Sequence, residues 1–225
     1  MALADYQALV DDLTRDDTGQ IVTADRDEAI ARAVSRYSQD RPRLQKQDIA
    51  ADAQQKLSLP SGWEAGFSEL RSIEHPLGSV PPLFLDQDRY ALYDDGTNVK
   101  LMLIDAVTVG ETLRVEYTIA HVLNGSTDTL PAIHREAVAK WAAALLLDQL
   151  AARYAGTSDS TLQADAVEHG SKSRDYAARA ASLRKQYLNE IGVEDRRNVA
   201  HGAVVNLDQA DSRGQDRLTH PRRFR

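Results

Sequence analysis

The chain has 225 residues, no cysteine and a formal net charge of −7, with 42% hydrophobic and 27% charged residues. This composition is typical of a globular protein and argues against disorder throughout. The lack of cysteine excludes disulfides, thiol nucleophiles and thiolate metal ligands. The sequence also has no apolar run of membrane-helix length and no signal-peptide pattern in residues 1–17, so we expect a soluble protein without a membrane partner.

The charge is unevenly distributed along the chain. Residues 193–225 hold seven arginines against five carboxylates, a charge of +2, so residues 1–192 carry −9. An acidic body disfavours the wrapping of nucleic acid, which requires clustered lysine and arginine. We therefore expect double-stranded DNA near this protein to slide past it without sequence-specific binding.

Two helices are expected near the start of the chain. The first covers residues 4–15, where apolar residues fall on one side. In the second, Thr23 has the chemistry of an N-cap, and carboxylates follow in the first turn, where the helix dipole favours them. Pro42 disfavours helical geometry at the residue before it, which predicts a helix end near residues 38–40.

Between residues 44 and 123 the pattern changes to short runs of branched and aromatic residues separated by glycine and proline, which is typical of strands and turns. Asp95 and Gly96 predict a hairpin turn, and residues 111–123 alternate apolar with polar. We expect these strands to form an antiparallel sheet with one buried face. Residues 45–57 suit a helix by propensity and a strand by position, and we favour the strand.

Residues 131–192 are predicted to form a helical pair. Pro131 suits the first turn of the third helix and Gly156 its end. The fourth helix begins at Ser158 or Asp159 and carries apolar or small residues alternately four and three positions apart, which places them on one face. Our candidates for helix packing or a subunit interface on this face are Leu162, Ala166, His169, Tyr176, Ala180, Leu183 and Tyr187.

These elements predict an α+β fold. We expect a mainly α-helical bundle with a long C-terminal helix, an inserted antiparallel β-rich region and an extended C-terminal arm. The predicted divisions are 1–43 for the N-terminal helices, 44–130 for the insertion, 131–192 for the helical pair and 193–225 for the arm. The arm has no sustained periodicity, so we expect it to be ordered only on a partner.

No motif predicts a catalytic, cofactor or metal site. The six histidines form no H-E-x-x-H pattern, and the Gly170-Ser171-Lys172-Ser173 run lacks both the spacing and the context of a phosphate loop. The aspartates near the hairpin lack the spacing of a calcium loop, so we interpret them as turn residues. We assign no catalytic residue, cofactor or metal, and we expect a protein that is not an enzyme.

One alternative comes from a different class of protein. A small hydrolase or ligand-binding enzyme can assemble its site from residues far apart in sequence, because catalytic triads need not be local. Dispersed candidates for such a site are His121, Asp105 and Glu116. A pocket with converging ionisable groups would favour this alternative.

The order of segments resembles the head-to-tail connector, or adaptor, proteins of tailed bacteriophages. The resemblance rests on DEAIARAVSRYSQDRPR at residues 27–43, on LRVEYTIAHVL at 113–123 and on the helical pair from PAIHREAVAKW onward, and it covers most of 27–192. It implies a structural virion protein, made in the bacterial host cytoplasm and located in the neck at the head-tail interface. The β-rich insertion is larger than in compact adaptors.

The resemblance also implies partners. Adaptors form a homo-oligomeric ring beneath the portal, so we expect about twelve copies in cyclic symmetry. The ring would extend the DNA channel and join the head to a tail, stopper or tail-terminator protein. In that family the C-terminal segment often reaches into the portal, which makes Arg217, Arg222, Arg223, Phe224 and Arg225 the candidates for portal contacts. The close alternative is another neck or tail-completion protein.

Overall fold

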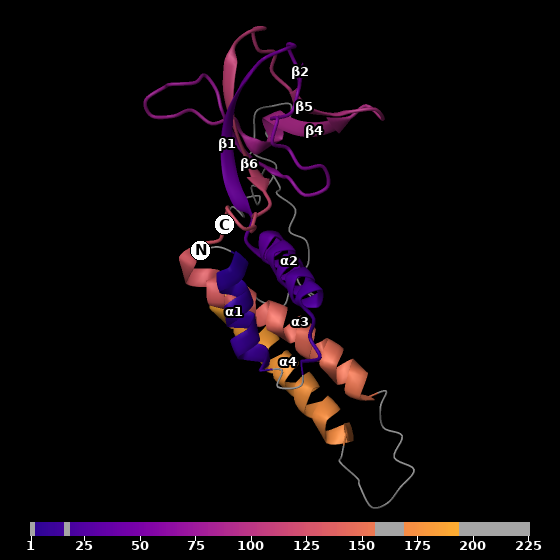
Figure 1. Ribbon diagram of the computed structural model, residues 1–225. Coiled ribbons are helices and arrows are strands. Elements are labelled where there is room, and N and C mark those ends of the chain that lie inside the picture. The colour runs from indigo at the N-terminus through magenta and orange to yellow at the C-terminus, as the bar shows by residue number, and fades with distance from the viewer. Residues whose placement is uncertain (1–2, 16–18, 156–168, 194–225) are drawn as a thin grey trace, which may run out of the picture.

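The computed structural model describes residues 3–15, 19–155 and 169–193. In this part of the chain helices and strands occupy separate regions, with the sheets at one end of the molecule and the helices at the other (Figure 1). The helices are α1 (Leu3–Thr14), α2 (Thr23–Asp40), α3 (Arg135–Ala155) and α4 (His169–Ile191), with short 3-10 turns η1 (Gln87–Arg89) and η2 (Ala132–His134). The predicted α+β class is confirmed. None of the described helices is long and apolar enough to cross a membrane.

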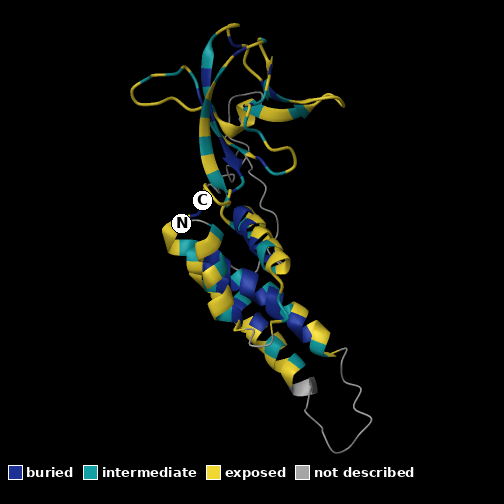
Figure 2. Cartoon of the chain, viewed as in Figure 1, coloured by how far each residue is buried: buried dark blue, intermediate teal, exposed yellow. Residues whose placement is uncertain are grey.

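The helical region is built around α3, which packs against α1, α2 and α4. Helix α2 is amphipathic, and the apolar residues along one face are buried: Ala29, Ile30, Ala33, Val34 and Tyr37. Helix α3 is buried around most of its circumference, as expected for the central helix of a bundle (Figure 2). One hydrophobic core therefore joins helices from both ends of the sequence.

The predicted helix boundaries hold closely at the end of α2 and less well at its start. Helix α2 ends at Asp40, and the Arg41 N–H donates to the Tyr37 carbonyl oxygen at 2.7 Å before Pro42 follows. Thr23, however, is the first residue of the helix and not its N-cap. The N-cap is Val22, which has no side-chain oxygen to bind the first turn.

Two three-stranded antiparallel sheets form the β-rich region. In the first sheet the order is β1 (Arg43–Ala50), β6 (Thr112–Ile119) and β3 (Leu70–Glu74). In the second it is β2 (Lys56–Leu57), β5 (Val99–Leu103) and β4 (Tyr90–Asp94). The strand favoured for the ambiguous residues 45–57 is confirmed by β1 and β2.

The predicted grouping of the strands is wrong in one respect. We expected the β4–β5 hairpin and β6 to share a sheet, but they belong to different sheets. Strand β6 already pairs with β1 on one edge and β3 on the other, so it has no edge free for the hairpin. The two sheets instead share a hydrophobic core, in which Leu113, Val115 and Tyr117 of β6 join Leu101 and Leu103 of β5.

The predicted hairpin turn is confirmed between β4 and β5. Gly96 has a φ of 84°, a left-handed conformation that glycine adopts without steric cost. The Asp95 carboxylate accepts the N–H groups of Thr97 and Asn98, and Asp94 accepts that of Gly96. These aspartates therefore stabilise the turn. Among the described residues, no group of His, Asp and Glu is arranged to hold a metal ion.

Candidate functional site

The stripe of α4 packs within the chain wherever its side chains are described. Ala180, Leu183 and Tyr187 are buried in the helical core, and the half-buried Tyr176 stacks on Tyr154 of α3 with ring centroids 5.5 Å apart. Leu162 and Ala166 lie outside the described residues, and His169 opens α4 with its side chain outside the description. A role for this stripe between subunits stays a prediction.

Tyr187 anchors the end of α4 to the end of α2. Its hydroxyl donates to Asp40 Oδ2 at 2.8 Å, and its ring lies 4.7 Å from the Trp141 ring of α3. Arg36 Nε lies 2.9 Å from the same Asp40 oxygen. Burial and the nearby Asp40 carboxylate raise the pKa of Tyr187, so the hydroxyl stays protonated and remains a donor.

The point at which the arm leaves the helical bundle is also fixed. Arg41 follows α2, and its Nη2 donates to the Ile191 carbonyl oxygen at 2.7 Å. Val193, the last described residue, donates its N–H to Leu188 at 3.2 Å and packs on the helical core. The portal-contact candidates Arg217, Arg222, Arg223, Phe224 and Arg225 all lie outside the described residues.

The dispersed residues considered for an enzyme site are not brought together by any described hydrogen bond or ion pair. Asp105 pairs with Arg89, and Glu116 accepts a hydrogen bond from Ser72 at 2.8 Å. His121 is buried where β6 meets the helices. Each of the three side chains is therefore engaged by its own partners.

His121 links the two regions of the molecule. Its ring nitrogens lie 3.0 Å from the carbonyl oxygens of Thr129 and Arg41, and its backbone N–H donates to Ser38 Oγ at 2.9 Å. Burial lowers the pKa of His121, which favours the neutral ring. A neutral ring can donate to only one of these two carbonyl oxygens, because it carries one N–H. The His121 side chain and backbone together contact residues at the end of α2 and after β6, so we interpret His121 as a structural link between these two elements.

An apolar groove lies beside this link. Its volume is about 490 Å3, and its walls are the start of α1, one face of α2, a turn in the β-rich region and the segment after β6. The lining residues are Leu3, Asp27, Ile30, Ala31, Val34, Ser35, Ser38, Glu64, Phe67, Ala120, His121, Val122 and Leu123. Motif and periodicity did not predict the groove, because it is assembled from four separate segments.

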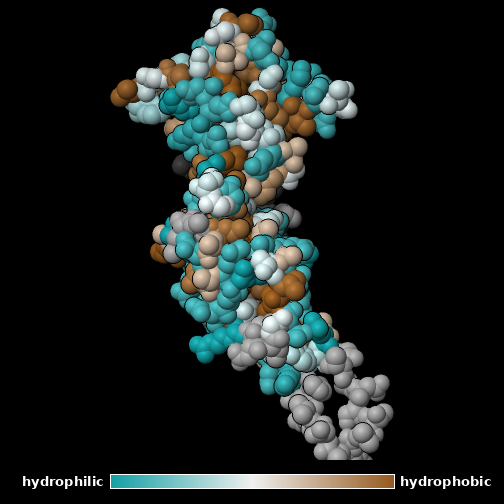
Figure 3. Space-filling model, in the orientation of Figure 1, coloured by the Kyte–Doolittle hydropathy of each residue, from teal (hydrophilic) through white to brown (hydrophobic). Residues whose placement is uncertain are grey.

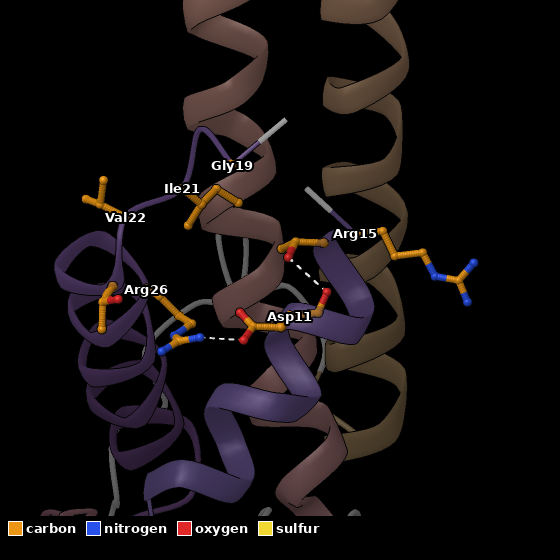
Figure 4. Close-up of a pocket in the computed structure, with 8 residues that line it drawn as sticks. Asp11, Arg15, Gly19, Ile21, Val22 and Arg26 are labelled. Atoms are coloured by element: carbon orange, nitrogen blue, oxygen red, sulfur yellow. Dashed lines mark hydrogen bonds and ion pairs between the residues drawn. The ribbon is translucent and has the colours of Figure 1, made fainter. Parts of the chain in front are cut away.

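A second pocket, of about 410 Å3, lies at the α1–α2 connection. Asp11 and Arg26 point toward each other across it and form an ion pair, while Arg15 points away (Figure 4). Its lining includes Arg15 and Gly19, and residues 16–18 between them in the sequence lie outside the description. The Asp11 carboxylate and the Arg26 guanidinium neutralise each other, so neither is free to bind a charged ligand in this pocket.

The loop between β3 and η1 exposes apolar side chains. Val80 is 96% exposed, and Leu83 and Phe84 are 51% and 57% exposed. Figure 1 shows this loop projecting from the sheets, and Figure 3 shows hydrophobic surface at its tip. Exposed apolar groups that cluster in this way are typical of contact surfaces. The sequence held a signal for this loop in its prolines, Pro76, Pro81 and Pro82, but we interpreted them only as turn punctuation.

No family model matches the sequence, and no curated protein matches it. Among solved structures, the chain is similar to one described as "Neck of native GTA particle computed with C12 symmetry", with 13% sequence identity. That match covers 78% of this chain and 92% of the other, with a TM-score of 0.27. A TM-score this low does not establish a common fold, so assignment of a function depends on the chain's own residues.

Proposed function

We propose that this chain is a structural neck protein of a tailed-phage-like particle, and specifically a head-to-tail adaptor. The observation that carries the proposal is a helical bundle interrupted in sequence by a β-rich insertion. Helices α1 and α2 pack on α3 although 94 residues, from Arg41 to His134, separate α2 from α3. This is the arrangement that the resemblance to adaptor proteins implies.

In this proposal about twelve copies form a ring beneath the portal, through a heterologous side-by-side interface. The sheets and the helices lie at opposite ends of the molecule, which gives such a ring two structurally different faces (Figure 1). One face would meet the portal and the other a stopper, tail or tail-terminator protein. The acidic body, with its charge of −9, would weakly repel DNA passing through the channel.

The arm supplies the proposed contact with the portal. It leaves the bundle at Val193, where Arg41 holds the end of α4. Arg217, Arg222, Arg223 and Arg225 would pair with portal carboxylates, and Phe224 would fill an apolar site there. Ordering the arm would cost conformational entropy, so we expect weak self-association without the portal and ring formation on it.

The test is electron microscopy of the full chain mixed with its candidate portal. We expect ring-shaped density on the portal for the full chain. A variant lacking residues 194–225 should keep the helical circular dichroism of the full chain and lose attachment. A ring that forms equally well without the arm would overturn the docking role of the arm. Absence of any ring with the portal, together with binding to a tail component, would instead identify another neck or tail-completion protein.

A further inference from the structure

The groove beside His121 has a chemistry that defines its occupant. Its floor is apolar, with contributions from Ile30 and Val34 of α2, Phe67 of the turn and Leu123 after β6. Val122 on its rim is 43% exposed. A groove of this volume is large enough to enclose a bulky side chain and the residues flanking it.

The charge of the groove has one sign. Its described lining includes the carboxylates of Asp27 and Glu64 and neither lysine nor arginine. Asp27 Oδ1 accepts from Gln7 Nε2 at 2.6 Å and lies 3.9 Å from Arg26 Nε, and Glu64 Oε2 accepts from the Ala120 N–H at 3.1 Å. In the described part of the chain, the second oxygen of each carboxylate has no hydrogen-bond partner. An apolar floor with two acidic acceptors favours an apolar side chain flanked by cations.

The chain itself contains a segment of this chemistry. Residues 222–225 are Arg-Arg-Phe-Arg, at the end of the arm that follows Val193. Ser38, which lines the groove, lies one helical turn before Arg41, and Arg41 holds the carbonyl of Ile191 at the start of the arm. A flexible chain of 30 residues, the number from Val193 to Arg222, would have a root-mean-square span of about 30 Å. The arm therefore starts beside the groove and is long enough to return to it.

We propose that the groove formed by α2, the Glu64–Phe67 turn and the segment after β6 binds the arm of the same chain, with Phe224 on the apolar floor and the flanking arginines paired with Asp27 and Glu64. The same chain is favoured over a second copy because tethering gives the arm a high effective concentration at the groove. The contact stores the arm until a partner displaces it. It goes beyond the adaptor role, because it requires neither a ring nor a portal.

The experiment uses the absence of native cysteine. A single Thr219→Cys variant of the full chain carries a nitroxide, and paramagnetic broadening of backbone amides is measured on the isotope-labelled protein. We expect broadening at residues 31–35 and 64–67. Phe224→Ala should abolish it, whereas Phe84→Ala, which removes an exposed phenylalanine elsewhere, should leave it unchanged. Broadening that survives Phe224→Ala, or that never occurs at these residues, would overturn the proposal.

Two further experiments distinguish the possible occupants of the groove. Ser35→Arg places a cation on the exposed side of α2 in the groove and should abolish the broadening, whereas Ser182→Arg on the exposed side of α4 should not. In the second experiment, nitroxide-labelled chains without isotope are mixed with isotope-labelled chains without nitroxide. Broadening in this mixture would show that the arm binds a second copy and would overturn binding within one chain. Portal attachment is not measured, so failure here leaves the adaptor proposal testable on its own.

Discussion

At the scale of single residues, polar side chains fasten the ends of the helices to one another. Tyr187 of α4 donates to Asp40, which is also paired with Arg36 and whose side chain is only 10% exposed. Arg41, one residue further, holds the carbonyl of Ile191. A buried hydrogen bond to a charged acceptor contributes more than a neutral one, because the acceptor has lost its water.

Substitution Tyr187→Phe tests this fastening. It removes the hydroxyl and keeps the ring in place against Trp141, so the packing is preserved and Asp40 loses one of its two described partners. We expect the free energy of unfolding to fall by about 2 kcal/mol. Denaturant unfolding followed by circular dichroism measures the loss.

The matched control is Tyr93→Phe. The Tyr93 ring contacts Lys56 Nζ at 4.0 Å from its centroid, and its hydroxyl has no hydrogen-bond partner in the described part of the chain. This variant should stay within about 0.5 kcal/mol of the native protein. Equal effects of the two substitutions would show that the Asp40 contact contributes nothing.

At the scale of elements, a close approach holds the turn after Pro60 against β6. A Cβ atom at Gly62 would lie 2.7 Å from the Tyr117 hydroxyl oxygen. Tyr117 is fully buried, donates to Gln47 Oε1 at 3.2 Å and packs beside Trp63. Neither partner can retreat without disturbing the core between the sheets.

We therefore expect Gly62→Ala to destabilise the β-rich region by about 1–3 kcal/mol through overpacking. Gly125→Ala is the matched control, since a Cβ there would meet nothing within 4 Å and its φ is not positive. The double variant Gly62→Ala with Tyr117→Phe removes the clashing oxygen and should recover part of the loss. Thermal unfolding is measured for the native protein, Gly62→Ala, Gly125→Ala and the double variant. A Gly62→Ala variant with the stability of the native protein would refute the steric account.

Elements with a strong local period were predictable from the sequence. In β6 the alternation of Leu113, Val115 and Tyr117 with polar residues matches the buried and half-buried faces of the strand. The division into two sheets was not predictable, because strand pairing depends on which edges are already occupied by residues far away in sequence. Local pattern determines that a strand forms and leaves its neighbours undefined.

The candidate site likewise has a part that the sequence could predict and a part that it could not. Ala180, Leu183 and Tyr187 share one helix face by spacing alone, so periodicity could indicate that they pack together. The groove combines residues of α1, α2, the Glu64–Phe67 turn and the segment after β6. No local signal marks it, since each lining residue on its own resembles an ordinary core or surface position.

At the scale of the whole molecule, the described structure has two hydrophobic cores that share no buried residue. The contacts around His121 that join the two regions include hydrogen bonds to Ser38 Oγ and the Arg41 carbonyl oxygen, and a ring contact with Tyr37 at 5.0 Å. Hydrogen bonds contribute about 1 kcal/mol each to stability, whereas burial of one large apolar side chain contributes about 1.5–3 kcal/mol. We expect the cores to unfold as separate units with weak coupling.

The two tryptophans make this expectation measurable, because Trp63 packs on the core between the sheets and Trp141 on the helical core. In a Trp63→Phe background, Leu146→Ala should shift the fluorescence transition of Trp141 by about 2–5 kcal/mol, the cost of a cavity in α3. In a Trp141→Phe background the same substitution should leave the transition of Trp63 nearly unchanged. Ile73→Ala in β3, also fully buried, should give the reverse pattern. If either substitution shifted both transitions equally, the two cores would unfold together as one cooperative unit. The contacts around His121 would then couple the unfolding of one core fully to that of the other.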